Sequence, residues 1–228
     1  MTAIERVLVS ITVATLIGAM AWYMIRQCRK PHGWLGGLIV RIMNRSHSDL
    51  ISWGLEHVQV SRSDAALDVG CGGGLTVQRI AKMADLGKVH GVDYSTASVA
   101  TARAFNRSGI ESGGVVIESA TVSRLPFPND SFDLVTAVET HYYWPDLPRD
   151  LREIYRVLKP GGSLLIMAEA YRGRNSGLLY QLVLKPLGVA FLSPNDHRDL
   201  LLKAGYSDVQ FSLEPARGWI CASGRKPR

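Results

Sequence analysis

Cysteine is scarce in this chain, and its spacing excludes two kinds of site. The 228 residues include three cysteines, Cys28, Cys71 and Cys221, with no CxxC pair among them. Neither a disulfide framework nor a cysteine-based zinc site is therefore indicated. The six histidines show no metal-ligand spacing either. We expect a protein of a reducing compartment without a bound metal ion.

Signals for nucleic-acid binding are also lacking. The formal net charge is +6, but the positive residues gather in residues 26–30 and 225–228 instead of forming a stripe. No known nucleic-acid-binding motif accompanies them, and there is no internal repeat or low-complexity tract. Because 46% of the residues are hydrophobic, the chain can bury a full core. We expect a folded protein without a nucleic-acid partner.

Charge is missing altogether from residues 7–25. An α-helix of this length would span roughly 28 Å, close to the hydrocarbon thickness of a bilayer. Trp22 and Tyr23 lie near one end, where aromatic side chains prefer the membrane interface, and basic residues follow at once. We expect a transmembrane helix that anchors the protein by residues 1–30. By the positive-inside rule the rest of the chain would lie in the cytoplasm.

Two other interpretations of this segment compete with the anchor. Ala19, Met20 and Ala21 resemble a signal-peptidase site, and a signal peptide would export the protein. We favour the anchor because the apolar run continues past this site and the residues before the run are weakly basic. A buried core helix fits poorly with this length and the lack of polar breaks.

Strands and helices alternate through the rest of the chain. Residues 31–64 read as a linker with two short amphipathic helices, and residues 65–228 as the main domain. Strands are expected at 66–69, 88–93, 115–118, 132–138 and 163–168, and helices at 75–84, 96–106 and 147–158. Such alternation is typical of a parallel sheet with helices on both faces.

The C-terminal part breaks this alternation. A helix is expected at 195–204, followed by strands at 208–213 and 219–222 that are too close together for a helical crossover and should pair antiparallel. The predicted fold is therefore α/β: a Rossmann-like, doubly wound, mainly parallel seven-stranded sheet with an antiparallel C-terminal hairpin, preceded by the transmembrane helix.

An insert at residues 171–192 separates the fifth strand from the C-terminal helix. It begins polar and continues apolar, with interruptions at Pro186 and Gly188. In a doubly wound sheet, ligands bind at the carboxyl ends of the strands, where this insert emerges. Two interpretations remain open: a helix packed on the core, or a surface that acts as a lid over an apolar substrate or rests on a membrane.

A glycine-rich turn follows the first strand of the main domain. Residues 67–74 read LDVGCGGG, and residues 89–95, VHGVDYS, place Asp93 at the tip of the second strand. Glycines allow the backbone to approach a ligand closely, and a terminal acidic residue can accept two hydrogen bonds from ribose hydroxyls. Asp68 precedes the glycines, which suits a cationic ligand and would repel a pyrophosphate. These features predict a nucleotide-type cofactor site.

Two further motifs make the pattern specific. They are LPFPNDSFDLVTAVET at 125–140 and LREIYRVLKPGGSLLIMAE at 151–169. In this order and at these spacings, the four stretches resemble class I S-adenosylmethionine-dependent methyltransferases, closest to the small-molecule group that includes ubiquinone and menaquinone C-methyltransferases. The resemblance covers residue 44 to the C-terminus. It implies S-adenosyl-L-methionine as cofactor and in-line methyl transfer to a small acceptor.

The resemblance also implies roles for individual residues. The glycines would wrap the methionine part of the cofactor, Asp93 would hold the ribose hydroxyls, and Tyr94 would lie along the adenine. Relatives often carry an aspartate where this chain has Thr121, so either Thr121 or the backbone near Val122 is expected to meet the adenine. The expected cofactor-binding residues are Asp68, Gly70, Cys71, Gly72, Gly74, Asp93, Tyr94, Ser95, Thr121, Val122 and Glu139.

Candidate catalytic residues follow the fourth strand, where the transferred methyl group should lie. We expect His141 to act as a general base or as a hydrogen-bond partner of the acceptor, with Tyr142 as the second catalytic candidate. Tyr142 and Tyr143 would line the pocket or orient the sulfonium through their ring faces. His47, in the helices before the main domain, is an alternative to His141.

The anchor and the apolar insert together favour a lipophilic acceptor, such as a quinone precursor, a sterol or another isoprenoid. Two other classes of function remain open. The chain could bind S-adenosylmethionine without catalysis as a membrane-tethered protein, or it could be a nicotinamide-dependent oxidoreductase.

Overall fold

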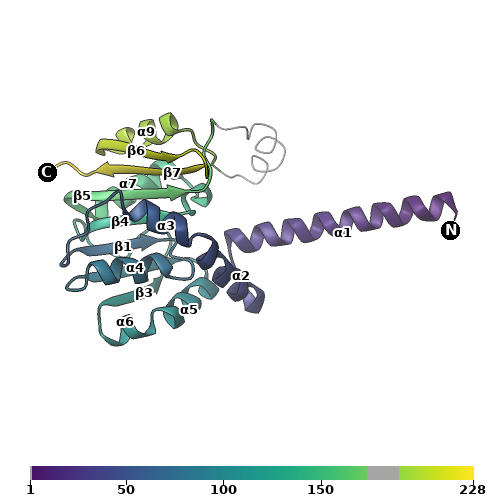
Figure 1. The fold of residues 1–228 in the computed structure, drawn as a ribbon, viewed down its shortest axis with the longest axis horizontal. Helices are drawn as coiled ribbons and strands as arrows, with labels where there is room; N and C mark the ends of the chain where they lie inside the picture. The colour runs from purple at the N-terminus through teal and green to yellow at the C-terminus, as the bar shows by residue number, and fades with distance from the viewer. Residues whose placement is uncertain (1, 174–189) are drawn as a thin grey trace.

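The protein folds around one seven-stranded sheet (Figure 1). The computed structural model describes residues 2–173 and 190–228. The strands are β1 (Ala65–Val69), β2 (Lys88–Asp93), β3 (Val115–Ser119), β4 (Phe132–Val138), β5 (Leu158–Ala168), β6 (Ser207–Glu214) and β7 (Trp219–Arg225). Their order in the sheet is β3-β2-β1-β4-β5-β7-β6. The first five strands pair with one another in parallel, while β7 pairs antiparallel with both β5 and β6. The predicted parallel sheet with an antiparallel C-terminal hairpin is confirmed.

Helices lie on both faces of this sheet, except the first, which projects away from the domain (Figure 1). They are α1 (Ala3–Arg29), α2 (Gly33–Ser46), α3 (Ser48–Leu55), α4 (Leu75–Met83), α5 (Thr96–Phe105), α6 (Arg107–Glu111), α7 (Leu147–Val157) and α9 (Pro194–Lys203), with a 3₁₀ turn, η1 (His141–Tyr143). Strand side chains alternate between the two faces. Leu165 and Met167 of β5 join the hydrophobic cluster under α3 and α4, whereas Leu164 and Ile166 join the cluster under α7 and α9.

Helix α2 begins earlier than the sequence suggests. Residues 31–37 read as a turn because of their proline and glycines, yet α2 starts at Gly33. Gly36 lies inside this helix, where a larger residue would not fit. A Cβ atom at this position would come within 2.8 Å of the Pro31 carbonyl carbon. This glycine therefore serves the close packing of α2 on the preceding chain.

The prediction of a transmembrane helix is wrong. Across residues 2–173 and 190–228, no helix combines the length and the apolar character needed to cross a membrane. The membrane anchor and the single-pass localisation predicted from residues 7–25 are therefore wrong as well. The uncharged segment carries polar side chains at Ser10, Thr12 and Thr15. Its last turn also serves another purpose, since Trp22 lines the cavity described below.

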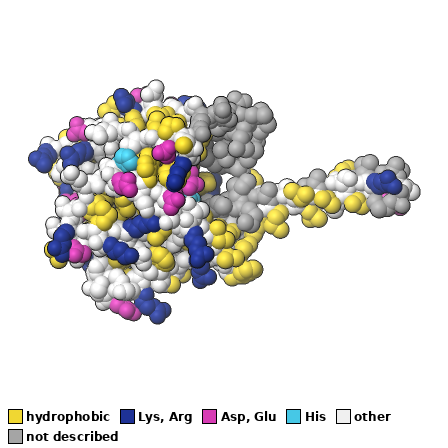
Figure 2. Space-filling view, in the orientation of Figure 1, with side chains coloured by type: hydrophobic (Ala, Val, Ile, Leu, Met, Phe, Trp, Pro, Cys, Tyr) yellow, Lys and Arg dark blue, Asp and Glu magenta, His cyan; other side chains and the backbone are white. Residues whose placement is uncertain are grey.

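Helix α1 is nevertheless an exposed apolar surface (Figure 2). Its N-terminus is closed by a capping box between Thr2 and Glu5. Leu8, Ile17 and Met20 are each more than half exposed along its length. Its C-terminal end is fixed to the start of α2, where the fully buried Gln27 side chain accepts a hydrogen bond from the His32 backbone N–H at 2.9 Å.

Most of the insert predicted at residues 171–192 lies outside the described residues. Its two described ends meet, because the Arg172 backbone N–H donates to the Leu192 carbonyl oxygen at 2.8 Å. The Ala190 backbone N–H then donates to the Tyr142 carbonyl oxygen at 3.1 Å. The insert thus leaves and re-enters the domain beside the turn that follows β4.

Candidate functional site

A cavity of about 550 Å³ lies at the carboxyl ends of β1, β2 and β4. The strand order reverses between β1 and β4, so this is the switch point where doubly wound sheets bind ligands. The floor is formed by residues 68–73, 92–94, 120–122 and 138–140. The roof is formed by the end of α1 and by α2, through Trp22, Arg26, Arg29, Lys30, Pro31, Val40, Met43, Asn44 and His47.

The glycine turn begins where β1 ends. The backbone N–H groups of Gly70 and Cys71 both donate to the Val92 carbonyl oxygen, at 2.8 and 2.9 Å, which fixes the turn against β2. Gly70 and Gly72 have positive φ angles of 74° and 52°, a region that favours glycine. A Cβ atom on Gly70 would collide with the Thr140 side chain, whereas one on Gly72 would meet no atom within 4 Å. Gly72 is therefore where a ligand can approach the backbone.

Two of the predicted cofactor residues shape the cavity without lining it. Gly74, also at positive φ, has no room for a side chain because Asn106 packs against it. Ser95 caps α5 by accepting a hydrogen bond from the Ser98 backbone N–H at 3.2 Å. The Ser95 hydroxyl also donates to the Pro31 carbonyl oxygen at 2.5 Å, which fastens the roof.

Asp93 joins the glycine turn to the end of β2. One carboxylate oxygen accepts from the Gly72 backbone N–H at 2.9 Å, and the other accepts from the Ser95 backbone N–H at 2.8 Å. Each oxygen keeps a further acceptor position for a ligand hydroxyl. Burial raises the pKa of Asp93, and these backbone donors oppose that shift.

Asp68 lies beneath the turn and is 1% exposed. Its carboxylate accepts a hydrogen bond from the Thr136 hydroxyl at 2.7 Å. Burial raises its pKa to about 7, with a contribution from the nearby charge of Asp93. A cation bound in the cavity would favour the ionised form of this carboxylate.

Cys71, in the same turn, is a buried free thiol that lines the cavity. Burial and the charges of Asp93 and Asp68 raise the pKa of this thiol well above its usual value. The side chain therefore stays protonated and acts as a small apolar group.

Side chains of the floor hold the roof in place. The Tyr94 hydroxyl donates to the Arg29 carbonyl oxygen, and the Lys30 ammonium lies 5.3 Å from the centre of the Tyr94 ring. From the other direction, the Asn44 side-chain amide donates to the Gly73 carbonyl oxygen at 3.0 Å. The cavity is therefore closed by contacts between segments that are far apart in the sequence.

At the far end of the cavity, beyond the glycine turn, two polar side chains face each other across the lining. These are His47, which follows α2, and Glu139, which follows β4. Glu139 has a positive φ of 55°, unusual for a residue other than glycine. Its Oε1 accepts from the Tyr142 hydroxyl at 3.1 Å and from the Glu169 backbone N–H at 2.5 Å. Burial raises the pKa of Glu139 to about 7.

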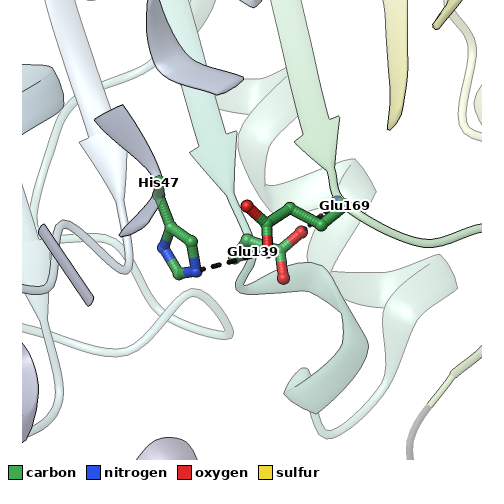
Figure 3. Close-up of side chains that lie close together, drawn as sticks. All are labelled: His47, Glu139 and Glu169. Carbon is green, nitrogen blue, oxygen red and sulfur yellow. Dashed lines mark hydrogen bonds and ion pairs between the residues drawn. The ribbon is translucent and has the colours of Figure 1, made fainter. Parts of the chain in front are cut away.

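Glu169, the last residue of the motif at 151–169, completes this group, although it is not among the predicted site residues. Its carboxylate lies 3.9 Å from the His47 Nε2 atom, and Figure 3 shows both side chains together with Glu139. Glu169 follows directly after β5, the neighbour of β4 in the sheet. Because parallel neighbours end at the same edge, this adjacency is the signal that could have identified it.

The predicted catalytic residues lie beside the cavity instead of lining it. His141 is 0% exposed, and its Nε2 atom lies 3.3 Å from that of His197 on α9. Burial lowers the pKa of His141 well below its usual value. Tyr142 is also buried, and its hydroxyl contacts Glu139 and the Ala170 carbonyl oxygen. Of the aromatic residues in this segment, Tyr143 and Trp144 do line the cavity.

Comparison with known proteins identifies the family. The family model described as a methyltransferase domain matches residues 67–166. An uncharacterized methyltransferase of Bacillus subtilis, YdaC, is 30% identical over 191 residues, which is 82% of this chain and 96% of that protein. The chain belongs to the S-adenosylmethionine-dependent methyltransferases. The predicted family, enzyme class and cofactor are thus confirmed.

Other relatives of the methyltransferase match over a shorter region. The demethylmenaquinone methyltransferase of Symbiobacterium thermophilum is 38% identical over 105 residues, 46% of this chain and 42% of that protein. The chain therefore spans less than half the length of that relative. A crystal structure of an S-adenosylmethionine-dependent methyltransferase from Aquifex aeolicus has a TM-score of 0.68 at 20% identity, covering 83% of this chain and 97% of that one. It shares the fold.

The cavity of the methyltransferase fits this cofactor. The space above Gly72 would be filled by a Cβ atom on any other residue, so the turn is open to a ligand there. The buried Asp68 carboxylate makes no ion pair with a lysine or arginine within residues 2–173 and 190–228, which suits a cationic ligand. S-adenosylmethionine supplies a methyl group activated by its sulfonium. Thr121 and Val122, which follow β3, also line the cavity.

Proposed function

We propose that the methyltransferase transfers a methyl group to a small, apolar acceptor that binds at the end of the cavity between His47 and Trp144. The observation that carries this proposal is the composition of the lining at that end. Met43, Ile51 and Val138 contribute apolar surface there, and His47 and Glu139 contribute polar groups. Pockets with an apolar lining and a few placed polar groups bind and orient small organic ligands.

The residues around the glycine turn would hold the cofactor. Gly72 lets the backbone approach it, Asp93 offers acceptor positions for the ribose hydroxyls, and Asp68 supplies a negative charge near the cationic part. The adenine would lie between Tyr94 and Thr121, which line the cavity on different sides of Asp93. These assignments are the ones that the family resemblance implies, and they are supported by the fact that each of these residues lines the cavity.

His47 is the residue best placed to act on the acceptor. Burial lowers the pKa of its imidazole, so the ring is neutral near pH 7 and able to accept a proton from a hydroxyl or an acidic carbon. Tyr142 acts as a positioning residue, since its hydroxyl contacts the Glu139 carboxylate and not the cavity. The protein would thus hold the acceptor in line with the methyl group and away from water.

We propose a hydroquinone with an apolar side chain as the acceptor class. Its ring would lie against the aromatic side chains of Tyr143 and Trp144, and a hydroxyl would face His47. The relative named demethylmenaquinone methyltransferase supports this class, because its name describes a quinone acceptor.

The test is to incubate the purified full chain with radiolabelled S-adenosylmethionine and either a prenylated hydroquinone or a polar amine, and to identify labelled products by mass spectrometry. We expect label in the hydroquinone. Asp93→Ala should lose both S-adenosylhomocysteine binding and transfer, whereas Asp199→Asn, at an exposed position of α9, should retain both. Label found only in the amine would contradict the proposed acceptor class. Unchanged cofactor affinity in Asp93→Ala would contradict the assignment of the ribose site.

A further inference from the structure

Three side chains capable of binding a metal ion converge at the acceptor end of the cavity (Figure 3). They are His47, Glu139 and Glu169, and one potential ligand atom from each lies within 4.8 Å of the others. Figure 3 shows the imidazole of His47 beside the carboxylates of Glu139 and Glu169. The three residues follow α2, β4 and β5 respectively, so their spacing along the chain could not reveal the group.

The donor set indicates which kind of ion would fit. One imidazole nitrogen with two carboxylate oxygens suits first-row divalent cations such as Mn²⁺ and Zn²⁺, whereas Mg²⁺ and Ca²⁺ prefer oxygen ligands alone. Three protein ligands leave at least one coordination position open, as in catalytic metal sites. His47 and Glu139 line the cavity, so an open position there would be accessible to a bound small molecule.

The negative charge of the two carboxylates also favours a bound cation. Two carboxylates lie close together at a partly buried position, and within the described part of the chain neither forms an ion pair with a lysine or arginine. A basic nitrogen, Nε2 of His47, lies 3.9 Å from the Glu169 carboxylate, and burial lowers the pKa of this imidazole. Carboxylates held together away from water are unfavourable unless a proton or a metal ion compensates them.

The surrounding contacts orient the ligands. The Tyr142 hydroxyl and the Glu169 backbone N–H both donate to Oε1 of Glu139, which fixes the carboxylate and leaves Oε2 for another partner. Hydrogen bonds of this kind hold metal-binding carboxylates in many proteins. The positive φ of Glu139 is what turns its side chain toward Glu169 at the end of the sheet.

We propose that His47, Glu139 and Glu169 bind one first-row divalent cation, such as Mn²⁺ or Zn²⁺, at the acceptor end of the cavity. With the ion bound, His47 would be a ligand and not a proton acceptor, and the open positions of the ion would hold an oxygen atom of the acceptor, such as a hydroquinone hydroxyl. That role rests on the proposed function, whereas binding of the ion does not.

The test uses the full chain, freed of metal with a chelator and then dialysed. Mn²⁺ is titrated in while the electron paramagnetic resonance signal of free Mn²⁺ is followed, and Zn²⁺ binding is measured by calorimetry. We expect one saturable site per chain for at least one of these ions. Glu169→Gln and His47→Gln should each weaken binding tenfold or more, while Glu111→Gln, at an exposed position of α6, should match the unaltered protein.

Binding of S-adenosylhomocysteine is measured on the same samples as a separate readout. We expect it to be retained in all three variants, since none of the altered residues is assigned to the cofactor. The metal proposal is overturned if neither ion binds at one site per chain, or if Glu169→Gln binds as tightly as the unaltered protein. If the unaltered protein binds the metal ion but does not methylate the hydroquinone, only the proposed acceptor is contradicted.

Discussion

Replacing Asp68 with asparagine should stabilise the cofactor-free protein and weaken cofactor binding at the same time. The Asp68 carboxyl is 1% exposed, and burial raises its pKa from 3.8 to about 7. Between these two pH values the folded protein binds more protons at this site than the unfolded chain does. The free energy of unfolding must therefore fall as the pH rises through this window.

The magnitude follows from the size of the shift. One pKa unit corresponds to about 1.4 kcal/mol, so a shift of about three units costs the folded protein about 4 kcal/mol at pH 8, where Asp68 is ionised in both states. At pH 5 the folded protein keeps the proton, and the cost is about 1.5 kcal/mol. Asparagine keeps the acceptor for the Thr136 hydroxyl and carries no charge. Its stabilising effect should thus be about 2–3 kcal/mol larger at pH 8 than at pH 5.

Urea unfolding followed by tryptophan fluorescence measures this difference in cofactor-free protein. Asp199→Asn, on the exposed surface of α9, is the matched control and should show no such pH dependence. S-adenosylmethionine should bind Asp68→Asn at least tenfold more weakly, a change of about 1.4 kcal/mol or more, because the variant lacks the negative charge beneath the turn that favours this cationic cofactor. The reasoning is refuted if the stabilising effect of Asp68→Asn is equal at the two pH values, or larger at pH 5.

Three further substitutions test how the cavity is built. Gly70→Ala should lower the free energy of unfolding by about 1–3 kcal/mol, because the new methyl group meets Thr140 and the φ angle of this residue is positive. Urea unfolding measures this change, and an unchanged free energy of unfolding would contradict the close contact. Asn106→Ala should cost about 1–3 kcal/mol in the same assay, since its side chain bonds two backbone carbonyls, and Asn106→Asp should not restore the loss. Tyr94→Phe should speed dissociation of S-adenosylhomocysteine in stopped-flow measurements, because the bond to the Arg29 carbonyl is lost; an unchanged rate constant would show that this bond does not hold the roof.

The parts of the site that the sequence predicted are those with a local cause. The positive φ of Gly70 and Gly72 and the place of Asp93 at the end of β2 depend on residues within one strand-turn-helix unit. Such a unit has a recognisable pattern, because close approach to a ligand demands glycine at fixed positions. The parallel pairing of the first five strands was predicted from the alternation of strands and helices.

The parts that the sequence did not predict depend on contacts between distant segments or on one backbone angle. The roof forms only when the end of α1 packs over Tyr94 and Ser95. After β4, Glu139 lines the cavity as expected but has a positive φ, whereas His141, expected at the acceptor, lies against His197 of α9. A propensity argument cannot anticipate a left-handed glutamate, which only the tertiary structure maintains.

The way the roof is fastened has a consequence for sequence variation. At the joint between α1 and α2, the acceptors are the main-chain oxygens of residues 29 and 31, and the donors are the hydroxyls of Tyr94 and Ser95. Any amino acid provides a main-chain oxygen, so the identities of Arg29 and Pro31 are not needed for these two bonds. Natural or engineered variants should therefore be free to exchange the covering segment, provided that the two hydroxyls beneath it are kept.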